Sequence, residues 1–324
     1  ICCMNIFSFI TLIGGLAFFL FGMNVMSGSL EKMAGGKLEH LLKKMTANPV
    51  ISIILGAVIT IAVQSSSAVT VMLVGLVNSG IMEFAQTLSV IFGANIGTTL
   101  TSWILSLSGI QGDSIWINML KPENFSPVIA LIGILMVMLS SSDRKKSIGT
   151  VFVGFAVLIY GMEMMTEAVS PLADSPQFAE LLTKFNQPLV GVAVGAIVTG
   201  VIQSSAASIG ILQALSLTGG ISYGMAIPII MGQNIGTCVT ALISCIGTNI
   251  QAKRVAVVHV LINVLGTVVW LPILWLVHAS IGLPFWDAAV SPVTIALSHS
   301  IFNIATTVLL MPFSKYLLRL TERL

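Results

Sequence analysis

The chain has very little charge. Only 8% of its 324 residues are Asp, Glu, Lys or Arg, whereas 56% are hydrophobic, and the mean hydropathy is +1.02. Soluble domains carry about 25% charged residues, so this composition excludes a soluble domain and predicts a protein embedded in lipid. The formal net charge of +2 is too small to suggest a nucleic-acid partner.

Cysteine is also scarce. The four cysteines lie in or beside apolar segments, without the spacing of metal ligands: Cys2, Cys3, Cys238 and Cys245. We interpret them as small buried hydrophobes, and we expect neither a transition-metal site nor an organic cofactor. The apolar segments contain no Lys or Arg, so any ligand held within them must be held by neutral dipoles.

Long hydrophobic runs recur along the whole chain. The clearest are Phe9 to Val25, Ala85 to Leu107, Ile148 to Met162, Val255 to Val277 and Thr294 to Met311. They approach or reach the length with which a helix crosses roughly 30 Å of hydrocarbon. Because they are spread from end to end, a cleaved signal peptide cannot explain them. We therefore predict an all-α, multi-pass protein of a plasma membrane, with a bacterial inner membrane favoured and the lipid bilayer as its surroundings.

Two polar clusters occur twice. Gln64-Ser65-Ser66 recurs as Gln203-Ser204-Ser205, and the Gly-Ala-Asn-Ile-Gly-Thr of residues 93–98 recurs as Gly-Gln-Asn-Ile-Gly-Thr at 232–237. The offset in numbering is the same for both clusters (203 − 64 = 139 and 232 − 93 = 139). A duplicated unit that keeps polar clusters inside apolar segments is typical of secondary transporters, whose site forms where two repeats meet.

Each Gln-Ser-Ser cluster divides an apolar stretch into two arms that are too short to span a membrane. We predict re-entrant helical hairpins around residues 49–78 and 188–217, with polar turns at membrane depth. Glycines flank Asn95 and Asn234, so we also predict that the spans 85–107 and 223–247 are broken helices whose free carbonyl groups suit sodium.

The basic residues predict the orientation. The segment 31–46 holds four lysines against two glutamates, whereas its counterpart 167–187 holds one lysine against three acidic residues. Basic short loops stay in the cytoplasm, so the two repeats should be inverted. The prediction is seven spans and two hairpins, with the amino terminus outside and the carboxyl terminus cytoplasmic. The units are repeat 1 (1–107), a linking span (108–146), repeat 2 (147–247), and two further spans with a basic tail (248–324).

Hydroxyls and amides can donate to the oxygens of an anion or offer oxygen to a small cation. At a hairpin tip they would also begin the second arm, where unpaired N–H groups favour an oxyanion. The alternative is that small polar residues only hold membrane helices together. We adopt that interpretation for Gly56, Gly75, Gly195, Thr60 and Thr199, but not for the doubled clusters.

The doubled motif resembles that of the type II sodium/phosphate cotransporter family, over essentially the whole chain. The resemblance implies sodium-coupled symport of inorganic phosphate by alternating access. It implies phosphate ligands at Gln64, Ser65, Ser66, Ser67, Gln203, Ser204 and Ser205. It implies sodium ligands at Gln64, Ser65, Asn95, Thr98, Gln203, Ser204, Asn234 and Thr237. We expect support for the site from Thr99, Thr101, Thr240, His259, Asn263, His299 and Asn303.

The second repeat departs from the first. Ala206 stands where the first repeat has Ser67, and Cys238 stands where it has Thr99, which leaves the ion stoichiometry open. Two His-X-X-X-Asn pairs, His259 with Asn263 and the later pair 299 and 303, each lie on one helical face. Interhelical hydrogen bonds, site support and a proton relay remain the alternatives for these pairs.

Two rival functions differ in class. A membrane enzyme could use Ser65 or Ser66 with His259 or His299, but no carboxylate is available to orient the histidine, and a symmetric doubled serine set is not needed for one nucleophile. We therefore predict that the chain is not an enzyme. A passive or sodium-dependent exporter of phosphate or a related oxyanion is the alternative transporter. A homodimer and a cytoplasmic regulatory domain trimmed from this chain are further expected partners.

Overall fold

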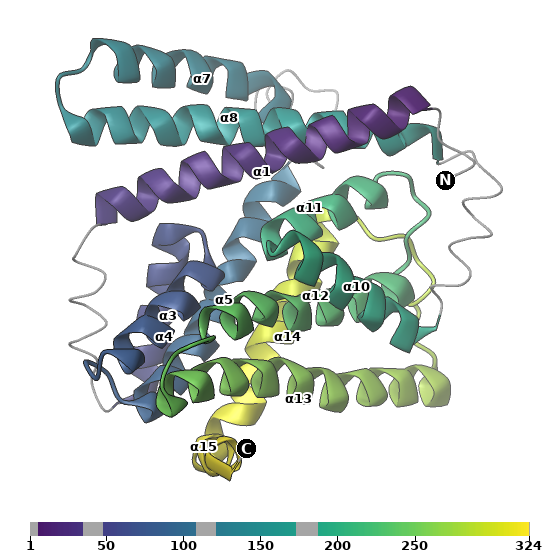
Figure 1. Ribbon diagram of the computed structural model, residues 1–324. Helices are drawn as coiled ribbons and strands as arrows, with labels where there is room; N and C mark the ends of the chain where they lie inside the picture. Colours follow the sequence, from purple (N-terminus) through teal and green to yellow (C-terminus); the bar gives the residue numbers. More distant parts are fainter. Residues whose placement is uncertain (1–5, 35–47, 108–120, 173–186, 324) are drawn as a thin grey trace.

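The computed structural model describes residues 6–34, 48–107, 121–172 and 187–323, and most of these residues lie in helices (Figure 1). The first repeat supplies α1 (Ile6–Ala34), α3 (Pro49–Val63), α4 (Ser66–Asn78) and α5 (Phe84–Ser106). The second supplies α8 (Asp143–Val169), η2 (Ser170–Leu172), α10 (Pro188–Ile202), α11 (Ser205–Ser216) and α12 (Tyr223–Ser244). Between and after them come α7 (Pro122–Leu139), α13 (Ile250–Ile281), α14 (Pro292–Leu310), η4 (Met311–Phe313) and α15 (Ser314–Arg323).

The prediction of an all-helical chain with several membrane-length apolar helices is confirmed. Within the described residues, six helical segments are long and apolar enough to cross a membrane: Ile6–Met33, Phe84–Ser106, Asp143–Leu172, Tyr223–Ser244, Ile250–Ile281 and Pro292–Arg323. The seventh predicted span falls on α7, which has 18 residues and is not among the six. α7 instead packs along α8, where a Cβ at Gly133 would collide with the carbonyl oxygen of Gly149, and a Cβ at Gly149 would collide with that of Gly133.

The predicted break in each long polar helix is wrong. α5 and α12 run without interruption through Asn95 and Asn234. Their glycines serve close packing instead, because a Cβ at Gly93 would collide with the carbonyl oxygen of Ile53 in α3. A Cβ at Gly232, the counterpart of Gly93 in the second repeat, would collide with the carbonyl oxygen of Val192 in α10. Absence of a side chain lets two backbones approach, so these glycines bring helices together rather than unwind them.

The glycines that we interpreted as packing residues divide into two kinds. Gly56 faces the carbonyl oxygen of Val90, and Gly195 faces that of Ile229 in the same way, so both bring neighbouring helices together as predicted. Gly75 has nothing within 4 Å of the place that a Cβ would occupy. The packing interpretation of Gly75 is therefore wrong.

The equivalent helices α1 and α8 pack against each other antiparallel. Gly15 contacts Gly161, and Gly22 contacts Gly154. An offset of 139 converts Gly22 to Gly161 and Gly15 to Gly154, so the two contacts are exchanged by the internal repeat. Such self-complementary pairing is the pattern of a twofold axis between equivalent units.

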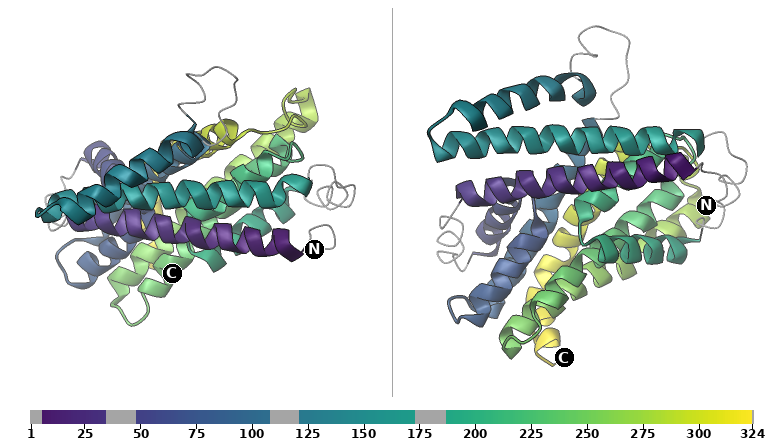
Figure 2. Two further views of the ribbon diagram at one scale, coloured as in Figure 1. Left: turned by 90° about the horizontal axis from the view of Figure 1, so that it is seen from above. Right: turned by 45° about the horizontal axis from the view of Figure 1, so that its top comes forward.

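The paired helices α3–α4 and α10–α11 approach the middle of the molecule from opposite ends. In Figure 1 the first pair lies toward the left and the second toward the right, with the two-residue turns of both pairs between them. The views of Figure 2 show α1 and α8 side by side along one face of this assembly. α13 passes beneath it and α14 runs down through its middle, and both helices pack against α5 and α12.

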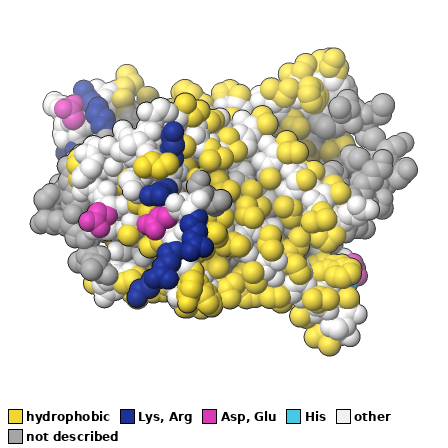
Figure 3. Space-filling view, turned by 60° about the horizontal axis from the view of Figure 1, so that its bottom comes forward, with side chains coloured by type: hydrophobic (Ala, Val, Ile, Leu, Met, Phe, Trp, Pro, Cys, Tyr) yellow, Lys and Arg dark blue, Asp and Glu magenta, His cyan; other side chains and the backbone are white. Residues whose placement is uncertain are grey.

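Basic residues collect beside α13 and α15. Arg254 donates to the carbonyl oxygen of Glu322 at 2.9 Å, which ties the start of α13 to the last helix. On that face, Lys and Arg form a band next to an extended hydrophobic surface (Figure 3). The carboxyl end of α1 and the amino ends of α8 and α13 lie at the same side of the molecule in Figure 1.

Candidate functional site

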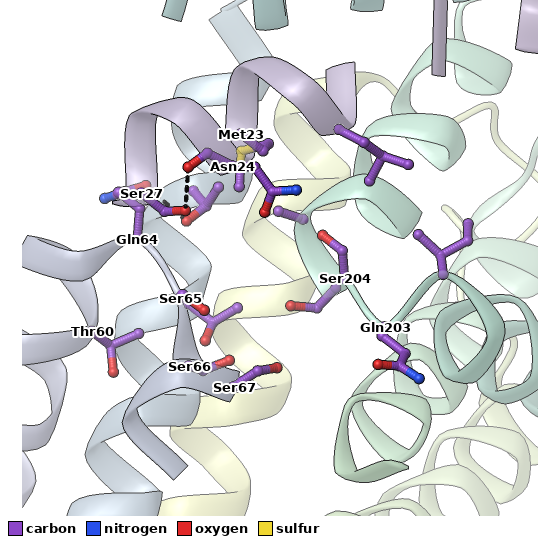
Figure 4. Close-up of a pocket in the computed structure, with 16 residues that line it drawn as sticks. Met23, Asn24, Ser27, Thr60, Gln64, Ser65, Ser66, Ser67, Gln203 and Ser204 are labelled. Carbon is purple, nitrogen blue, oxygen red and sulfur yellow. Dashed lines mark hydrogen bonds between the residues drawn. The ribbon is translucent and has the colours of Figure 1, made fainter. Parts of the chain in front are cut away.

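The two Gln-Ser-Ser turns line one cavity of about 280 Å³ (Figure 4). Its lining comes from α1, from the two helical pairs and from α5. The lining residues are Leu20, Met23, Asn24, Ser27, Thr60, Gln64, Ser65, Ser66, Ser67, Thr98, Thr101, Ile202, Gln203, Ser204, Ser205 and Ala206. All seven residues predicted to bind phosphate are therefore brought together, although they come from the two separate repeats.

The turns have an unusual backbone. Gln64 and Gln203 both have φ of 57°, and they are the only residues other than glycine with positive φ in the described parts of the chain. The N–H of each donates at 2.7 Å to a threonine carbonyl oxygen one turn earlier, which ends the first helix of the pair. A left-handed conformation costs a side-chain-bearing residue roughly 1–3 kcal/mol and is typical of functional sites.

Serine begins the second helix of each pair. The Oγ of Ser65 accepts from the N–H of Ala68 at 3.1 Å, and the Oγ of Ser204 accepts from that of Ala207 at 3.2 Å. Each hydroxyl is thus an N-cap that retains its own proton for donation. Other N–H groups of the first turn have no partner within the helix. The positive ends of α4 and α11 therefore both lie at the cavity, while none of the described residues that line it is charged.

Gln64 is held by two hydrogen bonds. Its Nε2 donates to the carbonyl oxygen of Ile61 at 2.7 Å, and its Oε1 accepts from Oγ1 of Thr101 at 3.0 Å. In the second repeat the counterpart of Thr101 is Thr240, whose buried hydroxyl has no partner. Gln203 is exposed and lies away from the serines in Figure 4. The two halves of the site therefore share a backbone but differ in their side chains.

Three of the remaining sodium candidates do not line the cavity. Thr98 lines it, but Asn95, Asn234 and Thr237 are buried and are not among its lining residues. Asn234 donates from Nδ2 to the carbonyl oxygen of Ile230 at 2.8 Å, and Thr237 donates to that of Gln233 at 2.9 Å. Both side chains are therefore hydrogen-bonded to backbone carbonyl groups of their own helix.

The first His-X-X-X-Asn pair lies in a buried polar network between α5, α12 and α13. Asn263 accepts from Nδ2 of Asn95 at 3.3 Å, and its own Nδ2 donates to the carbonyl oxygen of His259 at 3.0 Å and to Sγ of Cys238 at 3.3 Å. Nδ1 of His259 is buried without a partner. Asn263 therefore makes interhelical hydrogen bonds, which is one of the alternatives given for these pairs.

The second pair joins α14 to α5. Asn303 donates to the carbonyl oxygen of His299 at 2.9 Å, and Nδ1 of His299 lies 2.8 Å from Oγ of Ser102. Gln213 of α11 donates to the carbonyl oxygens of Ser102 at 3.0 Å and Pro292 at 3.1 Å. Neither histidine lines the cavity, so no serine–histidine pair of the kind that an enzyme needs is formed with Ser65 or Ser66. Thr99 donates within α5 to the carbonyl oxygen of Ile96 and also lies outside the cavity.

The sequence interpretation missed several lining residues, above all Asn24 and Ser27 of α1 and Thr60 of α3. The only signal for the α1 residues was a polar pair three positions apart near the end of an apolar run. Thr60 was interpreted as a packing residue, like Thr199. Thr199 indeed donates to Oγ of Ser208 at 2.8 Å, but Val69 occupies the position equivalent to Ser208, and the buried hydroxyl of Thr60 has no partner.

Comparisons with known proteins agree with the duplication. The profile of the Na+/Pi-cotransporter family matches residues 18–167 and again residues 157–283, and the starts of the two matches differ by the repeat offset (157 − 18 = 139). The uncharacterized protein YqeW of Bacillus subtilis (strain 168) is 30% identical over 95% of this chain and 95% of its own length. No solved structure matches the chain.

Two relatives carry functional names. The putative inorganic phosphate export protein YjbB of Escherichia coli (strain K12) is 23% identical over 93% of this chain, which spans about half (53%) of that protein. The sodium-dependent phosphate transport protein 2A of Rattus norvegicus is 36% identical over 99 residues, which are 30% of this chain and 15% of that protein. With the family profile matched twice and a full-length relative at 30% identity, the chain belongs to the Na+/Pi-cotransporter family, a family of transporters.

Proposed function

We propose that the chain is a symporter that carries inorganic phosphate into the cell together with sodium, and that both are bound in the cavity between the two Gln-Ser-Ser turns. The observation that carries the proposal is that these two turns, which lie far apart in the sequence, line one uncharged cavity with two helix N-termini. Family membership and the name of the rat relative favour phosphate and sodium.

Phosphate is the ligand that this chemistry suits. Serine hydroxyls donate to its oxygens, and each helix N-terminus adds roughly 0.3–1 kcal/mol, or up to about 2 kcal/mol where it is partly buried. In this proposal Ser65, Ser66 and Ser67 hold the anion from one side, and Ser204 and Ser205 hold it from the other. Gln64 and Gln203 shape the turns and offer their amides.

Sodium would supply the charge that the cavity lacks. Phosphate carries between one and two negative charges near neutral pH, and moving each into a negative interior costs about 2.3 kcal/mol per 100 mV. Each sodium ion that enters with phosphate cancels one of these charges, and a tenfold sodium gradient adds about 1.4 kcal/mol per ion, so we propose two or more sodium ions per divalent phosphate. We place sodium near Gln64, Ser65, Thr98, Gln203 and Ser204. The candidates Asn95, Asn234 and Thr237 would first have to exchange their present hydrogen bonds.

The proposal includes inverted repeats and re-entrant hairpins in a plasma membrane. The reciprocal glycine contacts of α1 and α8 and the opposite approach of the two helical pairs support it. Lys32, Arg144 and Lys253 lie at helix ends on one side of the molecule, which we assign to the cytoplasm, with the amino terminus outside. The predicted loops 31–46 and 167–187 fall largely outside the described residues. Alternating access would follow from movement of the hairpin units against the frame of α13 and α14.

Export is the second candidate, because the Escherichia coli relative is named a putative phosphate exporter. The test is uptake of radiolabelled phosphate into proteoliposomes that contain the purified protein. We expect uptake with an inward sodium gradient and little uptake with potassium in its place. Flux that ignores sodium would support a passive exporter, and absence of phosphate flux in either direction would reject both transport proposals.

A further inference from the structure

One face of α1 forms a third wall of the cavity. Leu20, Met23, Asn24 and Ser27 have the spacing i, i+3, i+4 and i+7, which places them on a single helical stripe. The opposite face of α1 packs against α8 through Gly15 and Gly22, whose backbones lie against that helix. A rigid helix therefore presents two polar side chains to the space where the turns meet.

The side-chain amide of Asn24, unlike that of Gln64 in the first turn, is free to bind a ligand. Its carboxamide extends toward Ser204, between the two turns, in Figure 4. In the described structure it makes no side-chain hydrogen bond, whereas both ends of the Gln64 amide are occupied by Ile61 and Thr101. Asn24 therefore offers two N–H donors and a carbonyl acceptor to whatever occupies the cavity.

The second repeat does not reproduce this wall. The residues that correspond to Met23, Asn24 and Ser27 at the offset of 139 are Met162, Glu163 and Thr166, and none of them lines the cavity. A carboxylate in the place of Asn24 would repel an oxyanion. Of the equivalent helices α1 and α8, α1 therefore lines the cavity and carries the neutral amide, whereas no described residue of α8 lines it.

We propose that Asn24 is a specificity-determining ligand that selects phosphate over sulfate; this inference rests on the proposed phosphate transport. The two anions have nearly the same size and tetrahedral shape, but near neutral pH phosphate keeps at least one proton and sulfate keeps none. The turns present hydroxyl and N–H donors, which any oxyanion accepts. The carbonyl oxygen of Asn24 accepts the P–OH proton, and sulfate would leave that oxygen unpaired. Sites that hydrogen-bond a substrate hydroxyl reject analogues without it once the bound substrate excludes water from the contact.

The test measures equilibrium binding of radiolabelled phosphate to the purified full chain in the presence of sodium, with unlabelled sulfate as competitor. Asn24→Leu keeps the size of the side chain and removes its polar atoms. We expect phosphate binding to weaken about 10- to 100-fold, as for the loss of a hydrogen bond to a charged group, while sulfate competition changes less than threefold. Asn24→Asp keeps the shape and adds a negative charge, so we expect a larger loss of phosphate binding.

Thr166→Val is the matched control, because Thr166 occupies the position equivalent to Ser27 but lies outside the cavity; we expect it to bind phosphate like the wild type. Asn24 is exposed, so its substitution should leave thermal stability unchanged, and Asn24→Asp provides a second variant if Asn24→Leu does not fold. Equal weakening of phosphate and sulfate in Asn24→Leu, or wild-type binding in both variants, would overturn the inference while the proposed function stands. Failure of the wild type to bind phosphate would overturn both.

Discussion

Oγ1 of Thr101 donates a 3.0 Å hydrogen bond to Oε1 of Gln64, the residue that ends α3 in a left-handed conformation. Thr101 is 4% exposed and Gln64 is half-buried, so the bond is partly shielded from water. It fixes the side chain at the head of the first turn. The equivalent hydroxyl of Thr240 makes no such bond to Gln203.

This difference predicts unequal effects of the same substitution in the two repeats. Thr101→Val removes the donor without changing the volume, and we expect apparent phosphate affinity to fall about 5- to 15-fold, as for one lost hydrogen bond of about 1–1.5 kcal/mol. Thr240→Val should leave affinity unchanged and should not lower thermal stability, because it removes an unsatisfied buried hydroxyl. Sodium-dependent uptake and thermal unfolding measure the two effects. Equal losses in both variants would contradict the asymmetry.

The serines at the start of α4 and α11 should matter for phosphate rather than for folding. We expect Ser66→Ala and Ser205→Ala to lower apparent phosphate affinity about tenfold each, while expression stays intact, because neither residue is the N-cap. Ser65→Ala should in addition lower the free energy of unfolding by about 1 kcal/mol through loss of the cap. Unchanged transport in both Ser66→Ala and Ser205→Ala would remove the anion role of these hydroxyls.

The close helix contacts predict a stability effect at glycine. In Gly93→Ala the new Cβ meets the carbonyl oxygen of Ile53, so α3 and α5 must separate, and we expect a loss of about 1–3 kcal/mol in the free energy of unfolding. Gly75→Ala is the control, since its Cβ meets nothing within 4 Å, and the better helix propensity of alanine should stabilise by about 0.5–1 kcal/mol. Thermal unfolding in detergent compares them. Two variants of equal stability would argue against the packing role.

The buried amides of Asn95 and Asn263 should depend on each other. Removing one partner leaves the other unpaired, so we expect Asn95→Ala and Asn263→Ala each to cost about 1–3 kcal/mol. A double-mutant cycle, measured by thermal unfolding, should give a coupling free energy of about 0.5 kcal/mol or more. Additive losses would indicate that the hydrogen bond between the two amides contributes nothing.

The inverted arrangement predicts opposite accessibility at equivalent positions. Ser79 follows α4, and its counterpart Thr218 follows α11 in the second repeat. In a background without native cysteine, Ser79→Cys should react with a membrane-impermeant reagent only from the cytoplasmic side, and Thr218→Cys only from outside. Reaction from the same side would disprove the inversion.

The sequence by itself determined that the chain is suited to a lipid environment, that it is helical and that it contains a duplicated unit. Composition and hydropathy are sums over residues, and a fixed offset of 139 can be counted without coordinates. The predicted bounds 49–78 and 188–217 agree closely with those of the α3–α4 and α10–α11 pairs, because Pro begins each first arm and the capping serine begins each second arm. Those signals act within a few residues of the backbone that they shape.

Only the tertiary structure decided which side chains reach the cavity. Whether a glycine unwinds a helix or receives a neighbour depends on a backbone far away in the sequence, which is why α5 and α12 were wrongly predicted to break. Thr60 and Thr199 occupy equivalent positions in the sequence. The hydroxyl of Thr199 donates to Ser208, whereas the hydroxyl of Thr60 has no partner, because Val69 stands in the position equivalent to Ser208. Asn24 enters the site because glycines dock the opposite face of α1 on α8. Contacts between distant segments set these outcomes, and a local pattern does not contain them.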